Sequence, residues 1–111
     1  MDPQHAAELL ARERARIERS LAELDRQNGD SELADVDQHL ADAGSELYDK
    51  ERDAGLIEQL RDQLAAVERA EKRLAEGKYG LSIESGEPIP DERLEAVPTA
   101  ERTVEEEAAA G

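Results

Sequence analysis

The side chains that could do chemistry in this sequence are almost all carboxylates. Residues 30–42 stand out because they contain five acids and no lysine or arginine. Asp35, Asp37 and Asp42 lie in this stretch together with His39. A carboxylate works as a general acid only when an apolar pocket raises its pKa, and this chain has little apolar material for such a pocket. We therefore predict that the protein is not an enzyme and has no catalytic residue.

The acidic stretch has two interpretations that the residues alone leave open. In the first it is a solvated loop, with Asp42 or Ser45 capping the helix that follows. In the second, Asp35, Asp37, His39 and Asp42 form a partner-binding tip that approaches a basic cavity or a bound metal ion in another protein. The attraction between such carboxylates and positive charge strengthens where water is excluded.

The overall charge narrows the choice of partners. The 111 residues carry a formal net charge of −15, which argues against binding DNA, RNA or an anionic membrane surface. No apolar run approaches the roughly 20 residues that span a bilayer, and no targeting segment is recognisable. We expect a cytoplasmic protein. The absence of cysteine excludes disulfides and cysteine-ligated zinc.

Two segments have the periodicity of amphipathic helices. The first covers about 3–27, with Asp2 as a suitable N-cap, and Asn28-Gly29 predicts its end. The second covers about 45–76 and is predicted to end at Gly77. Both are dense in charge of both signs, which is typical of solvated helices.

Each segment carries one stripe of apolar residues. Arg14 occupies the missing position of the first stripe, and Glu71 is the one break in the second. The steps of three and four give the 3.5-residue period of a coiled-coil seam. The predicted seam residues are Leu10, Ile17, Leu21, Leu24, Ile57, Leu60, Leu64, Val67 and Leu74. We predict an antiparallel pair within one chain, joined by an acidic turn at 28–44; a monomer is favoured and a homodimer remains possible.

The last third predicts a small module. Its expected mini-core comprises Tyr79, Leu81, Ile83, Ile89, Leu94, Val97 and Val104. Leu81 and Ile83 would lie on a short strand, with a turn at Gly86. One helical turn is expected to start at Pro90-Asp91, and Thr99 is expected to cap a final helix.

Residues in this last third resemble the C4 zinc-finger segment of the DksA/TraR family. The shared frame is Tyr79-Gly80, Gly86-x-Pro88-Ile89 and Arg93-Leu94-x-Ala96-x-Pro98-x-Ala100. Upstream, Asp37–Asp53 resembles the shorter, stress-protein-like bacterial members. The resemblance covers about 37–107, most of the chain.

The chain departs from the family at the four zinc-ligand cysteines. Ser82, Ser85, Thr103 and Glu106 stand in their places. Structural zinc needs thiolate or imidazole donors in a tetrahedral shell, and three hydroxyls with one carboxylate do not provide it. We therefore predict no bound metal and no other cofactor.

Together these features predict a mainly α fold. Residues 1–78 would form the antiparallel helical hairpin (coiled coil). Residues 79–111 would form a small metal-free, zinc-ribbon-like module with a short final helix and an acidic tail. The module is expected to pack on the end of the hairpin, because a segment of this size rarely folds alone without metal or disulfide.

The resemblance also implies a function. Members of the family regulate transcription by inserting a helical hairpin into the secondary channel of RNA polymerase, where acidic tip residues act near the catalytic magnesium. On this resemblance Asp42 matches the second acidic tip position, while His39 stands where the first Asp is found and Gly44 where Ala is found. The alternative is a non-catalytic interaction or self-association module that has lost polymerase binding.

Overall fold

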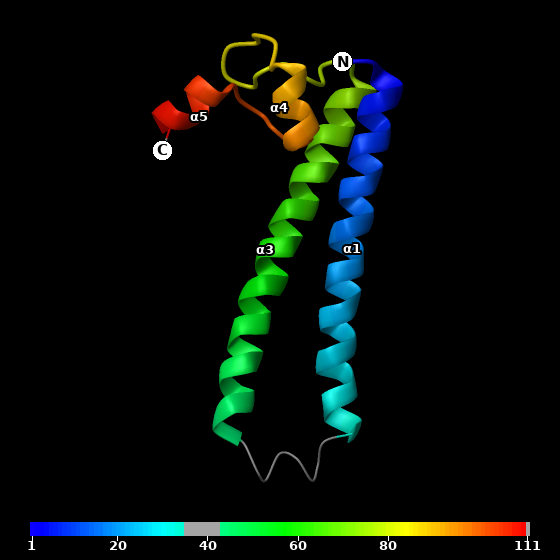
Figure 1. Cartoon of the computed structure of the whole chain (residues 1–111), viewed down its shortest axis with the longest axis vertical. Coiled ribbons are helices and arrows are strands. Elements are labelled where there is room, and N and C mark those ends of the chain that lie inside the picture. Colours follow the sequence, from blue (N-terminus) through cyan, green and yellow to red (C-terminus); the bar gives the residue numbers. More distant parts are fainter. Residues whose placement is uncertain (35–42, 111) are drawn as a thin grey trace. The chain divides into compact units, whose positions relative to one another are not determined.

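The computed structural model describes the backbone of residues 1–34 and 43–110, and the side chains of residues 1–27 and 51–110. Its helices, in chain order, are α1 (Pro3–Ala34), α3 (Ala43–Ala75), α4 (Asp91–Ala96) and α5 (Val104–Ala110) (Figure 1). The prediction of a mainly helical fold is confirmed. The four predicted tip residues, Asp35, Asp37, His39 and Asp42, lie outside the described residues.

Helix α1 begins as its sequence predicts but ends later. The N–H of His5 donates to Asp2 Oδ2 over 3.2 Å, so Asp2 caps the first turn. The helix then continues through Asn28-Gly29 to Ala34, and the predicted end at this dipeptide is wrong. A glycine in a helix interior costs only about 1 kcal/mol relative to alanine. Helical residues on both sides outweigh that local signal, and no proline interrupts them.

Helix α3 ends where the sequence predicts. Gly77 has a φ of 75°, a left-handed conformation that glycine adopts without steric cost. The N–H of Gly77 donates to the carbonyl of Leu74 over 3.1 Å, and the N–H of Lys78 donates to the carbonyl of Arg73 over 2.8 Å. These two bonds form a Schellman motif, which satisfies carbonyls that the helix end leaves open.

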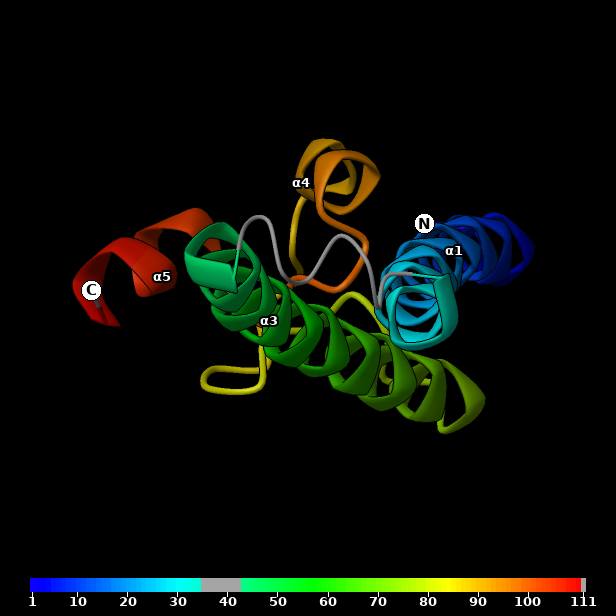
Figure 2. The same ribbon diagram turned by 90° about the horizontal axis from the view of Figure 1, so that it is seen from below.

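The chain divides into two compact units. Unit 1 comprises Met1–Ala15 and Ala65–Gly111, and unit 2 comprises Arg16–Leu64. Within each unit a stretch of α1 runs antiparallel to a stretch of α3 (Figure 1), as in the predicted hairpin. Unit 1 also holds α4, which lies to one side of the helix pair rather than continuing either helix (Figure 2). The predicted domain boundary at residue 78 stays a prediction.

The C-terminal module of unit 1 has its own small core. Ile89, Leu94 and Ala100 are buried there, with Met1, Tyr79 and Val97 packed against them. The hydroxyl of Tyr79 donates to the carbonyl of Pro98 over 2.7 Å, and burial raises the pKa of this hydroxyl.

Three predicted core residues are exposed instead. Leu81, Ile83 and Val104 have exposed fractions of 39%, 50% and 53%. The expected strand pairing is reduced to a single antiparallel bridge between Leu81 and Pro88. Ser82, between the two aliphatic residues, is buried instead. Successive side chains of an extended segment point to opposite sides, so an inward Ser82 turns Leu81 and Ile83 outward.

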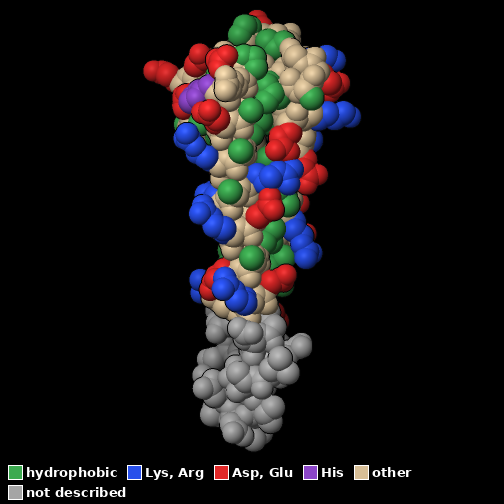
Figure 3. All heavy atoms as spheres, turned by 90° about the vertical axis from the view of Figure 1, so that its right-hand side faces the viewer, with side chains coloured by type: hydrophobic (Ala, Val, Ile, Leu, Met, Phe, Trp, Pro, Cys, Tyr) green, Lys and Arg blue, Asp and Glu red, His purple; other side chains and the backbone are tan. Residues whose placement is uncertain are grey.

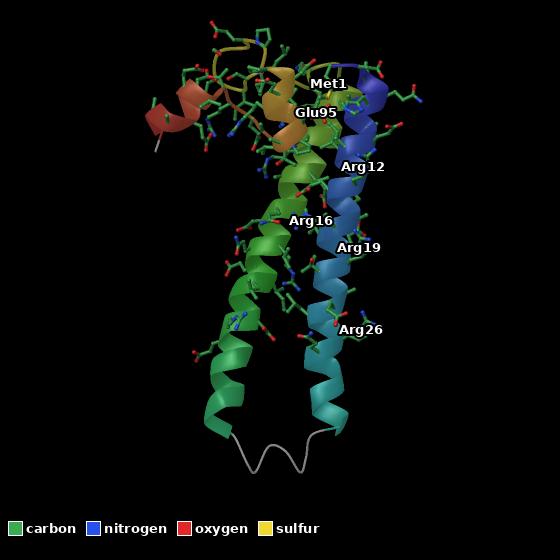
Figure 4. All side chains as sticks on the ribbon, viewed as in Figure 1. Met1, Arg12, Arg16, Arg19, Arg26 and Glu95 are labelled. Atoms are coloured by element: carbon green, nitrogen blue, oxygen red, sulfur yellow. The ribbon has the colours of Figure 1, made fainter. Side chains whose placement is uncertain are left out.

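The start of α1 contacts α4 within unit 1. The ring of His5 hydrogen-bonds to the carboxylate of Glu95, and the amino group of Met1 lies 3.3 Å from Asp91 Oδ1. Figure 4 labels Met1, which precedes α1, and Glu95 of α4. The module is therefore attached to α1 by polar contacts as well as by the apolar contact of Met1.

Candidate functional site

The four positions that replace the zinc ligands meet in the folded chain. They come from two segments, the loop Ser82–Gly86 (called the knuckle loop below) and the start of α5. Ser82 and Thr103 are only 5% and 8% exposed, and they are the buried polar residues of the described part of the chain. Buried polar groups need hydrogen-bond partners, and each of these two has them.

Ser82 organises the knuckle loop from inside. Its Oγ accepts the backbone N–H of Glu84 over 3.1 Å and that of Ser85 over 3.3 Å. Its carbonyl accepts the N–H of Gly86 over 3.0 Å, and Gly86 has the positive φ of 75° that this tight turn requires. One serine side chain thus satisfies two backbone donors of a loop that has no regular secondary structure.

Thr103 and Glu106 cap the N-terminus of α5 reciprocally. The N–H of Glu106 donates to Thr103 Oγ1 over 3.2 Å, and the N–H of Thr103 donates to Glu106 Oε1 over 2.9 Å. This is a capping box, in which two free N–H groups at a helix start are satisfied at once. The expectation that Thr99 caps the final helix is wrong, because α5 begins only at Val104. The signal for the correct cap is the sequence Thr-x-x-Glu at residues 103–106.

The pKa of the Glu106 carboxylate is lowered to about 2 by the hydroxyl of Ser82, the backbone N–H of Thr103 and the hydroxyl of Ser85. The N–H of Thr103 donates directly to its Oε1. Donors aimed at a carboxylate stabilise its charged form. The four positions where the resembling family carries cysteine therefore lie near one another, with one set of hydrogen bonds inside the knuckle loop and a second at the start of α5.

This group does not fit a zinc ion. Its donor atoms are three neutral hydroxyls and one carboxylate, whereas structural zinc is held by thiolate or imidazole groups. The carboxylate and the Ser82 hydroxyl already hydrogen-bond to protein atoms. Within the described residues, no group of three or more His, Cys, Asp or Glu side chains could hold a metal ion. The chemistry of the donors therefore assigns this group a structural role.

Glu101 joins the segment between α4 and α5 to α3. It lies 3.1 Å from Arg69 Nη2 and 3.2 Å from Arg73 Nη1. Burial opposes ionisation of Glu101, but the hydrogen bond from Arg69 and the charges of Arg69, Arg73 and Arg102 outweigh it and lower its pKa. The backbone carbonyl of Glu101 also accepts the N–H of Ile83 over 2.8 Å, which ties the knuckle loop to the segment before α5.

The predicted seam residues differ in burial. Leu10 and Val67 in unit 1, and Ile17 in unit 2, are 1% exposed or less. The others are partly buried: Leu21, Leu24, Ile57, Leu60, Leu64 and Leu74. Their assignment as one seam stays a prediction, because the two units are described separately.

Unit 2 contains an open hollow between α1 and α3 that sequence reasoning missed. Its volume is about 700 Å³, and its apolar lining includes Leu24, Leu56 and Leu60. Arg16 and Arg19 of α1 also line it; Figure 4 labels both, and Arg16 Nη2 donates to Gln63 Oε1 over 3.2 Å. The signal that could have found it is Leu56, which lies next to the predicted stripe and is 36% exposed.

Charged side chains of both signs cover the described part of the face drawn in Figure 3, with hydrophobic side chains between them. Such interspersed charge is typical of solvated helices. Among the described residues, no helix has the length and apolar content needed to cross a bilayer.

The fold defines a class of protein: an antiparallel helix pair with a C-terminal zinc-finger-like module that contains no cysteine. Comparison with known proteins gives this class a family context. Residues 83–109 match the prokaryotic dksA/traR C4-type zinc finger family. The transcription factor DksA2 from Pseudomonas aeruginosa has a similar structure, with a TM-score of 0.84 and 28% sequence identity, covering 97% of this chain and 81% of that one.

Two proteins of Bacillus subtilis (strain 168) are similar in sequence. General stress protein 16O is 44% identical over 65 residues, and the uncharacterized protein YteA is 42% identical over 69 residues. These matches cover 59% and 62% of this chain but only 40% and 29% of the two relatives. The resemblance to the DksA/TraR family that the sequence predicts is confirmed.

Proposed function

We propose that this protein regulates transcription by binding bacterial RNA polymerase through the secondary channel, without a metal ion. The observation that carries the proposal is the similarity to the transcription factor DksA2, which extends over 97% of this chain. Within the described residues no group of three or more His, Cys, Asp or Glu side chains could hold a metal ion, so the proposed binding depends on the helix pair. The proposal places the protein in the cytoplasm, where RNA polymerase acts.

The acidic residues between α1 and α3 are the proposed contact. Asp35, Asp37, His39 and Asp42 follow the end of one helix and precede the start of the next. Carboxylates presented to a basic cavity gain attraction because field lines are focused where water is excluded. A net charge of −15 favours a protein partner of this kind over nucleic acid.

A binding assay with purified bacterial RNA polymerase tests the proposal. We expect the full chain to bind at low salt, and Asp42→Asn to weaken binding by roughly tenfold, the usual size of effect when a close charge pair is lost. Asp62→Asn is the matched control, because Asp62 is exposed on α3 away from the proposed contact and should leave binding within about twofold of wild type. No binding of the wild-type chain at low salt would reject the proposal.

The hollow in unit 2 favours a second candidate function. Leu56 is partly exposed at an apolar surface that could receive a helix of another protein or of a second copy. Sedimentation velocity over a wide concentration range tests the self-association form. Mass that rises with concentration, and that Leu56→Glu abolishes, would support it. A strictly monomeric chain would reject that form.

A further inference from the structure

Residues at the end of α3 and in the knuckle loop form an open groove in unit 1. Its volume is about 400 Å³. We call it the knuckle groove, and its lining comprises Arg73, Lys78, Leu81, Ser82, Ile83 and Gly86. All of these residues belong to one compact unit, so the groove is a feature of a single body. The acidic contact proposed above does not use this surface.

The knuckle groove exposes two large aliphatic side chains of one extended segment. Leu81 and Ile83 are 39% and 50% exposed, whereas Ser82 between them is buried. Single exposed aliphatic residues are common on protein surfaces and need no explanation. Two of them at one groove form an apolar patch of the kind that receives a partner.

The backbone holds this apolar patch in place. The N–H of Ser82 donates to the carbonyl of Glu87 over 2.8 Å, and the N–H of Ile83 donates to the carbonyl of Glu101 over 2.8 Å. Turning Leu81 and Ile83 inward would break these two bonds, and each lost bond costs free energy. The surface is therefore preformed, so binding requires little further ordering of the chain.

The charge of the knuckle groove is opposite to that of the chain as a whole. Its described lining contains two cations and no carboxylate, although the chain carries 29 acids against 14 bases. Glu101 lies 3.2 Å from Arg73 Nη1 and offsets part of that positive charge. Lys78 is exposed, and its N–H donates to the carbonyl of Arg73 over 2.8 Å, which fixes its backbone at the end of α3. The groove thus presents a lysine together with two aliphatic side chains.

We propose that the knuckle groove is a second contact with RNA polymerase and binds a polymerase segment in which an aliphatic side chain lies next to a carboxylate. This inference rests on the proposed function, because it takes the polymerase as the partner. The aliphatic side chain covers Leu81 and Ile83, and the carboxylate pairs with Lys78. Burial of apolar surface supplies affinity, and the charge pair supplies specificity.

Nucleic acid and a second copy of this chain fit the knuckle groove less well. Tight binding to a phosphate backbone uses many lysine and arginine contacts, whereas the groove has two cations, and Glu101 offsets part of the charge of one. Two chains that each carry a net charge of −15 repel each other. An acidic protein segment matches both the apolar patch and the lysine.

The polymerase binding assay with the full chain tests the apolar part of this contact. We expect Ile83→Ser to weaken binding by about tenfold, because the variant loses an aliphatic contact at the interface. Val104→Ser is the matched control. Val104 is 53% exposed but does not line the groove, so its replacement should leave binding within about twofold of wild type.

Lys78→Gln tests the charged part of the contact. We expect a loss of about threefold at low salt that disappears at high salt, because salt screens an exposed charge pair. Lys72→Gln is the control, since Lys72 is exposed on α3 outside the groove lining. The change at Lys78 affects only an exposed side chain, so it keeps the proposal testable if Ile83→Ser does not fold.

The results distinguish failure of the groove from failure of the proposed function. No binding of the wild-type chain at low salt would reject the proposed function, and the groove contact with it. If Asp42→Asn weakens binding while Ile83→Ser and Lys78→Gln both stay within about twofold of their controls, only the groove contact is overturned. If both contacts exist, combining Asp42→Asn with Ile83→Ser should multiply their separate effects on the Kd, as expected for independent sites.

Two further measurements, made without polymerase, would assign the groove to another occupant and overturn the proposal. In sedimentation velocity, that result is a mass that rises with concentration and that Ile83→Ser abolishes, which would indicate a second copy of the chain. In a titration with a single-stranded oligonucleotide, it is binding that Lys78→Gln abolishes, which would indicate nucleic acid.

Discussion

Arg14 and Glu71 face each other across the helix pair of unit 1. Arg14 Nη2 lies 2.6 Å from Glu71 Oε1, and Arg14 Nε lies 3.3 Å from Glu71 Oε2. These residues are the two charged interruptions of the apolar stripes in the sequence. The two charged residues therefore form an ion pair with two contacts. This ion pair fixes which turn of α1 lies opposite which turn of α3.

We expect a double-mutant cycle on this pair to give a coupling of about 0.5–1 kcal/mol in the free energy of unfolding. The figure is modest because the two side chains are 36% and 38% exposed. Chemical denaturation of Arg14→Leu, Glu71→Leu and the double variant measures it. The exposed i,i+3 pair of Glu23 and Arg26 is the control and should give about 0.3 kcal/mol. Equal coupling in the two pairs would contradict a role of Arg14 and Glu71 in setting the register.

The stability of the protein should fall in acid because the Glu106 carboxylate becomes protonated. Its folded pKa is about 2, against an ordinary value of 4.5. Between these values the unfolded chain binds a proton that the folded chain does not, so the stabilisation is complete above pH 4.5 and is lost as the pH falls toward 2. Arg102, which lies 3.0 Å from Glu84 Oε1 and 3.9 Å from Glu107 Oε2, is the cation of the same two segments.

Thermal unfolding at several pH values checks this expectation. The difference in melting temperature between wild type and Glu106→Gln should be largest near pH 7 and should shrink below pH 4. Glu105→Gln should show no such trend. A difference that stays constant down to pH 3 would mean that the ionised carboxylate contributes nothing beyond its size.

Cysteines at the four converging positions should create a metal site. We expect the combined variant Ser82→Cys, Ser85→Cys, Thr103→Cys and Glu106→Cys to bind one zinc ion per chain, because four thiolates form the usual tetrahedral shell. A structural site of this kind binds zinc with about 10 kcal/mol or more, so a chelator should lower the melting temperature of the variant strongly. Wild type, given the same chelator, should not respond. Failure of the variant to bind cobalt or zinc stoichiometrically would show that the four positions do not converge.

Substituting alanine for glycine should change the stability of the protein in opposite directions at two positions. Gly55 lies inside α3, and a Cβ added there meets nothing within 4 Å, so Gly55→Ala should stabilise the protein by about 0.5–1 kcal/mol. Gly77 has a φ of 75°, and Gly77→Ala should destabilise it by about 1–2 kcal/mol. Denaturant midpoints of the two variants measure both effects. Stabilisation by Gly77→Ala would contradict the left-handed helix end.

Regular and local features were predictable from the sequence. The 3.5-residue period gave two helices, Gly77 gave the end of α3, and Pro90-Asp91 gave the start of α4, which begins at Asp91. The frame shared with the DksA/TraR family indicated the helix pair and the C-terminal module that follows it in the sequence. Each of these signals depends on residues within a few turns of one another. The failure at Asn28-Gly29 shows the limit, because a local end signal yielded to the helix on both sides of it.

The tertiary structure alone decided which polar residues meet. The sequence identified Arg14 and Glu71 as exceptions, and Ser82, Ser85, Thr103 and Glu106 as replaced ligands, but it did not show that either set makes contact. It also placed Leu81, Ile83 and Val104 in a core that Ala100 and Met1 help to fill instead. Such contacts join residues far apart in the chain, 57 positions apart for Arg14 and Glu71. These contacts form only when the chain folds, because folding brings donors of one segment within reach of acceptors on another.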